Sequence, residues 1–432
     1  MPRTYQSAPT RADAVTISLE EVRGRIGEGL LAVAAGIGLE VMTAMMDDDV
    51  AGLAGPKGKH DPARRAVRHG SGPGSVLLGG RRVAVTRPRV RGVDGAGELP
   101  LASYEAFNAG DLLGAQVLET MLAGVSARAY PRTLEPVGVD GKATSKSAVS
   151  RRVVAATSEA LGKVMNADLS HLVLPVIMID GIHFGEHLCV AALGIDVEGS
   201  KHPLALVEGS TENTTLVKGL LVGLRERGLD VTRPVLVVVD GSKALAAGVK
   251  QVFDHPVIQR CQVHKRRNVT DHLPDKLRDV VDARMRAAYA CPTVLEAEAA
   301  LGVLAKELDK THPGAAASLR EGMPDTLTVL RLGLDPTLAR SLRTTNAIES
   351  MNSMARDTCA NVTNWSSGTM ALRWLAAAML DAQPRWHHVK GHQHLPQLQA
   401  ALVRTVSPIG YARLSETDPD GPAQAEPDQV PR

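Results

Sequence analysis

The sequence predicts an α/β core, and three observations support that prediction. Two apolar runs, Val173–Asp180 and Pro234–Asp240, are too short for helices, and each ends in an aspartate. Two further strand patterns, His187–Asp196 and Pro203–Val207, follow the first run at turn-length intervals. A helical pattern, Thr214–Arg227, precedes the second run. Asp180 and Asp240 are therefore expected to emerge from the ends of strands in one sheet.

Length and composition indicate a globular protein that acts on a polyanion. The 432 residues suffice for several domains, and the net charge is only +2, yet ten Lys or Arg against one acid lie between Lys57 and Arg91. The four cysteines have no paired spacing, which favours a reducing compartment. No leader-like segment is found, and Gly29–Met42 is too short to span a bilayer. We expect a cytoplasmic, nucleoid-associated protein without membrane contact.

The first hundred residues divide into three patterns. Apolar positions at helical spacing over 17–47 predict one or two helices, and 54–80, rich in Gly, Pro and Arg, predicts a mobile loop that could lie on phosphates. The segment Arg81–Arg91 alternates apolar and basic residues as a strand does. It places three candidate DNA-binding residues on one face: Arg87, Arg89 and Arg91. A solvated edge strand is the alternative.

Residues 101–166 have a helical pattern with features of a helix-turn-helix. A helix is expected near Asp111–Leu122, followed by a break at Gly124 and a last helix that opens at Ser145. Hydroxyls and cations in its first turns suit phosphates and base edges. The candidate DNA-binding residues there are Lys146, Ser147, Arg151 and Arg152. A phosphate loop at Gly141-Lys142 is rejected, because Pro136 stands where that motif needs Gly.

The central element order predicts a specific α/β architecture. Three meander strands are followed by a helix, the strand ending at Asp240, the helix Ser242–Val252 and a short strand at Val257–Gln259. This is the order of the ribonuclease-H-like fold, whose active carboxylates lie on the first strand, after the fourth strand and on a late helix. Residues 264–340 read as helices only and predict an all-α insertion before that late helix.

The late helix is expected to begin in Arg343–Asn352 and to carry Glu349. Glu349 stands three residues after a plausible N-cap, Asn346, so helix capping is the alternative to an active-site role. Asp180 and Asp240 have a similar alternative, the capping of the turns that follow them. Two aspartates and a glutamate from separate elements would form an oxygen-rich site for two Mg²⁺ or Mn²⁺ ions. Such an ion pair activates a water or a DNA 3′-hydroxyl for in-line attack on a phosphodiester.

The chain resembles the bacterial mutator-like transposases known as the IS256 family. The matching pieces run in order from about residue 80 to 390: Asp180-Gly, Arg-Gly-Leu-Asp230, Val-Val-Asp240-Gly, Gln259-Arg-Cys-Gln-Val-His-Lys-Arg-Arg-Asn268 and Arg343-Thr-Thr-Asn-Ala-Ile-Glu349-Ser-Met-Asn. The resemblance implies a DDE triad of Asp180, Asp240 and Glu349 that binds metal. It also marks motif residues near that triad: Cys261, His264, Asn268, Thr345, Asn346 and Asn352. The first 80 residues match this family poorly.

The Cys261-x-x-His264 pair also supplies half of a tetrahedral zinc site. No second Cys/His pair at short spacing accompanies it, so a structural role beside the active site is preferred. The three following cations, Lys265, Arg266 and Arg267, are expected near the DNA backbone.

These patterns predict an α/β catalytic core with an all-α insertion and a mainly α N-terminal DNA-binding region. The expected segments are 1–53 (helical), 54–100 (basic arm and strand), 101–168 (helix-turn-helix-like), 169–262 (core, first part), 263–340 (helical insertion), 341–405 (core, last helices) and 406–432 (disordered tail).

The predicted function is a DNA transposase. It would bind the terminal inverted repeats of its element, cleave them with a two-metal DDE site and join them to target DNA, as a homodimer or higher oligomer on the DNA. Two alternatives stay open: a catalytically silent, domesticated DNA-binding repressor, and a ribonuclease-H-like nuclease without strand transfer.

Overall fold

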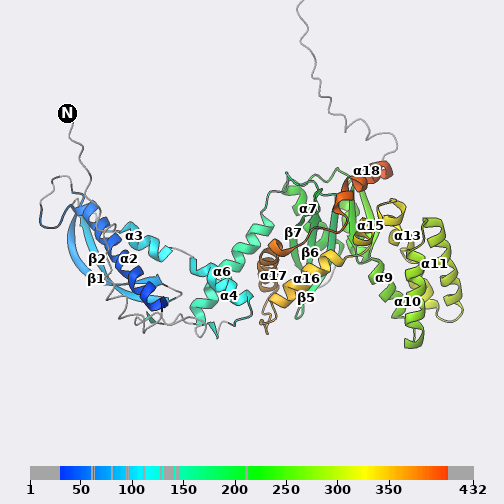
Figure 1. The fold of residues 1–432 in the computed structure, drawn as a ribbon, viewed down its shortest axis with the longest axis horizontal. Coiled ribbons are helices and arrows are strands. Elements are labelled where there is room, and N and C mark those ends of the chain that lie inside the picture. The colour runs from blue at the N-terminus through cyan, green and yellow to red at the C-terminus, as the bar shows by residue number, and fades with distance from the viewer. Residues whose placement is uncertain are drawn as a thin grey trace, which may run out of the picture. The chain divides into compact units, whose positions relative to one another are not determined.

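The computed structural model describes residues 30–406 except 60–61, 63, 79–80, 94, 96, 110–111, 127–128, 131–140, 143–145 and 210–212. The chain divides into two compact units, one of residues 1–159 with 360–362, the other of residues 160–359 with 363–432 (Figure 1). No described helix has both the length and the apolar composition that crossing a bilayer requires. The expected disordered tail and the start of the first predicted helix lie outside the described residues.

The first unit contains a β-hairpin with helix α2 (Leu30–Ala54) packed on it. The hairpin strands are β1 (Ala66–Leu78) and β2 (Arg81–Gly92), and the short strands β3 (Glu98–Leu99) and β4 (Gly141–Lys142) both pair with β2. A small core of Met46, Val50, Ala66, Val90 and Leu101 joins the helix to the hairpin. The unit also holds α3 (Ala102–Ala109) and α4 (Leu112–Leu122), and α6 (Lys146–Met165) begins there.

The expected mobile loop over 54–80 is wrong for about half of its length, because β1 occupies residues 66–78. Its Gly- and Ser-rich composition lacks the alternation that marks a strand. Antiparallel pairing with β2 makes this segment a strand despite that composition. Ala66 lies opposite Gly92, and Leu78 lies opposite Arg81. The predicted strand at 81–91 is confirmed as β2.

The second unit is built on a five-stranded mixed sheet of order β7-β6-β5-β8-β9. The strands are β5 (Val176–Phe184), β6 (His187–Ile195), β7 (Lys201–Gly209), β8 (Val235–Val239) and β9 (Pro256–Arg260). β5, β6 and β7 form the predicted antiparallel meander, and β5, β8 and β9 run parallel. The chain thus has the expected mixed α/β class in this unit.

Helices cover the sheet as the period-3.6 patterns predict. Side chains from α7 (Thr214–Glu226) and α8 (Lys243–Val252), among them Leu221 and Val249, form one core with Ile177 and Ile179 of β5. Because successive strand residues face opposite sides, Met178 and Asp180 point away from that core. Helix α16 (Asn346–Thr358) contacts β5, and α17 (Gly368–Ala382) contacts β6 and β7.

Seven helices lie between β9 and α16 along the chain. They are α9 (Gln262–Thr270), α10 (Asp275–Tyr289), α11 (Val294–Asp309), α12 (Pro313–Arg320), α13 (Met323–Thr326), α14 (Thr328–Arg331) and α15 (Pro336–Leu342). Helices α9 to α12 share a core of their own, centred on Met285, Leu301 and Leu319. After α17, two short 3-10 turns (Gln383–Arg385 and His392–His394) lead to α18 (Leu395–Val406).

Candidate active site

Asp180 lies inside β5 rather than at its end, which corrects the predicted strand boundary. β5 continues to Phe184 because the hairpin partner β6 pairs with it as far as His187. Its other neighbour, β8, stops pairing at Ile179, opposite Val239. Asp180 therefore stands where one side of the strand loses its partner, and its side chain is only 9% exposed.

Asp240 is the first residue after β8, on the same edge of the sheet. Its Oδ1 accepts a hydrogen bond from the backbone N–H of Ser242 at 2.8 Å, so the aspartate does shape the turn into α8. Gly241, with φ 117°, makes that turn, and any side chain there would strike the Arg260 guanidinium. The turn-capping alternative thus holds for one oxygen of Asp240, while parallel pairing of β5 with β8 sets the residue beside Asp180.

Glu349 does not cap its helix, so the capping alternative is wrong for this residue. The N-cap of α16 is Thr345, not Asn346, and it makes no side-chain capping bond. The Thr345 hydroxyl instead donates to Glu349 Oε1 at 2.6 Å. The next turn of α16 brings Asn352, whose Nδ2 donates to Asp180 Oδ2 at 3.0 Å. Helix α16 therefore presents Glu349 and Asn352 to the side of β5 that carries Asp180.

Electrostatics show that the structure brings the three predicted acids together. The pKa of Asp180 is raised to about 7, mostly by burial and in addition by the charges of Asp240 and Glu349, while His264 and the Asn352 hydrogen bond oppose the rise. Such a rise is typical of a carboxyl group that is buried and has other acids nearby. The Oδ1 atom of Asn352 is buried and has no hydrogen-bond partner among the described residues. An oxygen-rich, negatively charged pocket of this kind fits Mg²⁺ or Mn²⁺.

Cys261 and His264 lie beside Glu349. Cys261 is the N-cap of α9, and its Sγ accepts a hydrogen bond from the backbone N–H of Thr345 at 3.4 Å and lies 3.3 Å from the Thr345 hydroxyl oxygen. Burial opposes ionisation of Cys261, but hydrogen bonds from His264 and Thr345 leave its pKa below the usual value. The hydrogen bond to Cys261 raises the pKa of His264 to about 9, with Glu349 and Asp180 adding to the rise. His264 Nδ1 is 3.7 Å from Glu349 Oε1.

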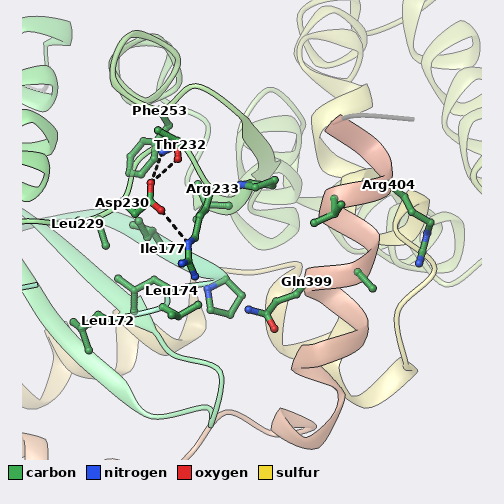
Figure 2. Close-up of a pocket in the computed structure, with 16 residues that line it drawn as sticks. Leu172, Leu174, Ile177, Leu229, Asp230, Thr232, Arg233, Phe253, Gln399 and Arg404 are labelled. Atoms are coloured by element: carbon green, nitrogen blue, oxygen red, sulfur yellow. Dashed lines mark hydrogen bonds and ion pairs between the residues drawn. The ribbon is translucent and has the colours of Figure 1, made fainter. Parts of the chain in front are cut away.

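The two remaining motif residues lie further from the acids. Asn268 is exposed on α9, one turn after His264, and Asn346 is exposed at the start of α16. Asp230, which belongs to another matching segment, stands at the opposite end of β8 from Asp240. It accepts hydrogen bonds from Thr232 and Arg233 on the wall of a 770 Å³ cavity beside α18 (Figure 2). Its role there is to hold the turn before β8.

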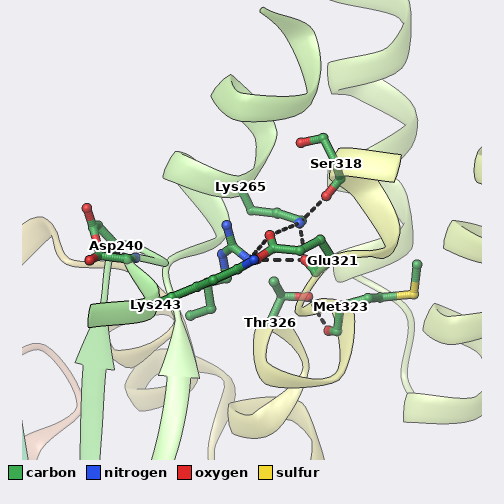
Figure 3. Close-up of polar contacts among 9 residues, drawn as sticks. Asp240, Lys243, Lys265, Ser318, Glu321, Met323 and Thr326 are labelled. Atoms are coloured by element: carbon green, nitrogen blue, oxygen red, sulfur yellow. Dashed lines mark hydrogen bonds and ion pairs between the residues drawn. The ribbon is translucent and has the colours of Figure 1, made fainter. Parts of the chain in front are cut away.

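Lys265 does not reach solvent, which corrects its expected place near DNA. Its side chain is fully buried, and its ammonium donates to the backbone oxygens of Ser318 and Glu321 (Figure 3). The Glu321 carboxylate lies 3.6 Å from Lys265 Nζ and 2.5 Å from Arg260. Burial lowers the pKa of Lys265 to about 8, an effect that Arg260 increases and Glu321 opposes. This cluster joins the β9–α9 segment to α12, and no local pattern in the sequence indicates it.

The other predicted DNA-binding cations divide by exposure. Arg266 forms an ion pair with Asp282 at 2.6 Å, whereas Arg267 is exposed. On β2, Arg87 and Arg89 both pair with Glu98, each at 2.6 Å, and Arg91 is exposed. On α6, the side chains of Lys146, Ser147 and Arg151 are exposed and that of Arg152 is half-buried. Glu98 lies outside the alternating segment that predicts the basic face, and it neutralises part of that face.

The raised pKa of Asp180 predicts a pH dependence of stability in metal-free protein. An acid whose folded pKa lies above its unfolded value of 3.8 favours folding at low pH, and that contribution is lost as pH rises toward about 7. We expect the free energy of unfolding to fall by roughly 3–4 kcal/mol from this group between pH 4 and pH 7.5. Urea denaturation at several pH values measures it. The Asp180→Asn variant should lack this decline, and an equal decline in both proteins would contradict it.

Comparison with known proteins identifies the family. The family model described as "Transposase, Mutator family" matches residues 29–389, so the match begins well before residue 80, where the resemblance was expected to start. The chain is 25% identical to the transposase for insertion sequence element ISRM5 of Rhizobium meliloti, over 86% of this chain and 92% of that protein. It is 28% identical to the IS6120 transposase of Mycolicibacterium smegmatis (69% and 91% covered) and 26% identical to the IS256 transposase of Staphylococcus aureus (63% and 71%). The chain therefore belongs to the Mutator family of transposases.

Proposed function

We propose that this protein is a DNA transposase that binds the terminal inverted repeats of its element, cleaves them at a DDE site and transfers the strands to target DNA. The observation that carries the proposal is the raised pKa of Asp180, about 7, to which burial contributes most and to which the charges of Asp240 and Glu349 also contribute. Family membership gives the substrate class. The strand order β7-β6-β5-β8-β9, with one acid on β5, one after β8 and one on α16, supports a ribonuclease-H-like core.

Asp180, Asp240 and Glu349 would hold two Mg²⁺ or Mn²⁺ ions. The ions supply Lewis-acid activation of a water or a 3′-hydroxyl and stabilise the leaving oxygen. The chain's own residues orient the ligands. The Thr345 hydroxyl fixes Glu349 Oε1, and the Asn352 amide fixes Asp180 Oδ2, so the remaining oxygens are preorganised.

The proposed function suggests a role for each segment of the chain. We assign 1–53, 54–100 and 101–168 to DNA binding and assembly, 169–262 and 341–405 to the catalytic core, 263–340 to a helical insertion in that core, and 406–432 to a tail. The separate core of helices α9 to α12 supports the insertion. A homodimer or a higher oligomer on DNA would bring two element ends together.

Nicking of the flanking DNA tests the function. The purified protein is incubated with DNA that carries the ends of its element, a labelled target plasmid and Mg²⁺. Nicks at the repeat ends together with joined products are expected. Specific binding without nicks would favour the repressor, and nicks without joined products would favour the nuclease.

The exposed cations on α6 and β2 predict two kinds of DNA contact. If α6 reads the repeats, Arg151→Ala should lower the preference for repeat over random DNA by about 1–3 kcal/mol. Arg91→Ala should weaken binding to both DNAs equally and reduce the salt slope by about 0.9, as loss of one phosphate contact does. Fluorescence anisotropy over a salt series measures both. Equal losses on the two DNAs for Arg151→Ala would place repeat recognition outside α6.

A further inference from the structure

A second set of metal ligands adjoins the three acids and shares one of them. Cys261 is the N-cap of α9, His264 follows one turn later, and Glu349 is in the first turn of α16. One ligand atom from each residue lies within 4.8 Å of the other two. We infer that these three side chains form a Zn²⁺ site, and that Zn²⁺ bound there inhibits the magnesium-dependent reaction by engaging Glu349.

The spacing of the ligand atoms suits zinc. Bonds of about 2.0–2.3 Å to nitrogen, oxygen and sulfur in a tetrahedron place ligand atoms about 3.3–3.7 Å apart. His264 Nδ1 and Glu349 Oε1 are already 3.7 Å apart. The Cys261 sulfur lies within 4.8 Å of a ring nitrogen of His264 and of a carboxylate oxygen of Glu349. Three protein ligands with a fourth position open to water is the arrangement of an accessible zinc site.

The chemistry of the ligands separates this site from the magnesium site. Thiolate and imidazole are soft ligands that select zinc, whereas Mg²⁺ takes carboxylates and water. Cys261 Sγ accepts a hydrogen bond from the backbone N–H of Thr345, and it sits at the N-terminus of α9, where partial positive charge favours a thiolate. Asp180 and Asp240 thus form the hard half of the pocket and Cys261 and His264 the soft half. Glu349 belongs to both.

The packing of α9 against the start of α16 builds the set. The backbone N–H of Gln262 donates to the carbonyl of Arg343 at 3.0 Å, which sets Cys261 beside Thr345. The third ligand is therefore an acid far along the chain rather than the second Cys/His pair that a zinc motif in the sequence would show. Thr345, bonded to both Cys261 Sγ and Glu349 Oε1, acts as the outer partner that orients two of the three ligands.

Inhibition rests on the proposed function, whereas zinc binding does not. A carboxylate that bonds to Zn²⁺ has one oxygen fewer for the Mg²⁺ pair, and the added cation repels Mg²⁺ at a few ångströms. Zinc should therefore reduce nicking even when Mg²⁺ is in large excess, because the two ions use different sets of ligands and do not simply exchange.

Cobalt substitution tests the site on the full-length protein. Reduced protein that has been stripped of transition metals is placed in excess Mg²⁺ and titrated with Co²⁺. Co²⁺ binds at zinc sites, and a bound thiolate gives an intense sulfur-to-cobalt charge-transfer absorption. We expect one equivalent to give this band and Zn²⁺ to abolish it. Cys261→Ser should remove the band, and His264→Asn should weaken Co²⁺ affinity by at least about 10- to 100-fold. Cys291→Ser, at the partly buried cysteine just after the C-terminal end of α10, is the matched control and should keep the band.

Each result has a definite meaning. Absence of the band in wild-type protein, or its survival in Cys261→Ser, overturns the site whatever the variants' folding. A second assay measures Mg²⁺-dependent nicking over a Zn²⁺ series, and the inhibitory concentration should rise by at least about 10-fold in Cys261→Ser relative to that variant's own zinc-free rate. Equal inhibition of both proteins overturns the regulatory role. Absence of nicking at all, with the cobalt band present, counts against the proposed function and leaves the zinc site standing.

Discussion

Replacing Asp180 by Asn should reduce Mg²⁺-dependent nicking by on the order of 10³-fold or more, because it removes the carboxylate that interacts electrostatically with both other acids. The amide keeps the shape of the side chain and an oxygen that can accept from Asn352 Nδ2. Repeat binding should persist or tighten, because negative charge facing phosphates is lost. Mg²⁺ should raise the melting temperature of the wild-type protein and not of the variant. Gel-based nicking and thermal unfolding measure these effects.

Asp230→Asn is the matched control for this experiment. Asp230 lies in the turn before β8, at the opposite end of that strand from Asp240. It accepts hydrogen bonds from Thr232 and Arg233 and has no second acid as a partner in these bonds. Its loss should leave nicking within a few-fold of wild type and cost about 1 kcal/mol of stability through the turn. Wild-type nicking in Asp180→Asn would remove that residue from the triad.

Replacing Glu321 by Ala should lower the free energy of unfolding by about 3 kcal/mol, near the lower end for breaking a buried ion pair. Lys265 is fully buried and Arg260 is 7% exposed, and the Glu321 carboxylate lies between them. Glu321 is itself 40% exposed, so water can partly replace its charge, which keeps the loss from being larger. Urea denaturation measures the effect.

A second substitution separates charge from packing at this cluster. Adding Lys265→Met to Glu321→Ala should recover much of the lost stability, because the buried cation is removed and an apolar chain of similar length takes its place. Glu307→Ala is the surface control. Its pair with Arg284 joins side chains that are 53% and 43% exposed, so its loss should lower the stability much less than the loss of Glu321. Equal losses for Glu307→Ala and Glu321→Ala would show that burial does not strengthen the Glu321 contacts.

Local sequence patterns located most elements of the second unit. The apolar runs marked β5 and β8, and the period-3.6 pattern marked α7 within one residue. Turn-forming residues separated the meander strands. These signals are readable because each depends on neighbours a few residues apart, and the burial of one face imposes a fixed period on them. β1 of the first unit lacks such a period, so its sequence predicts a loop although the segment is a strand.

The chemistry of individual side chains needed the tertiary structure. The sequence by itself indicated the element that carries each acid, because these elements have recognisable types and a recognisable order. Asp180 is on a strand of the meander, Asp240 follows the next strand but two, and Glu349 is on a late helix. The sequence did not decide whether Glu349 caps a helix or faces Asp180, nor that Lys265 is buried against Glu321. Those outcomes depend on contacts between residues dozens to more than a hundred positions apart. Only the packing of α16 against β5 and of α12 against α9 sets the distances on which burial, ion pairing and pKa depend.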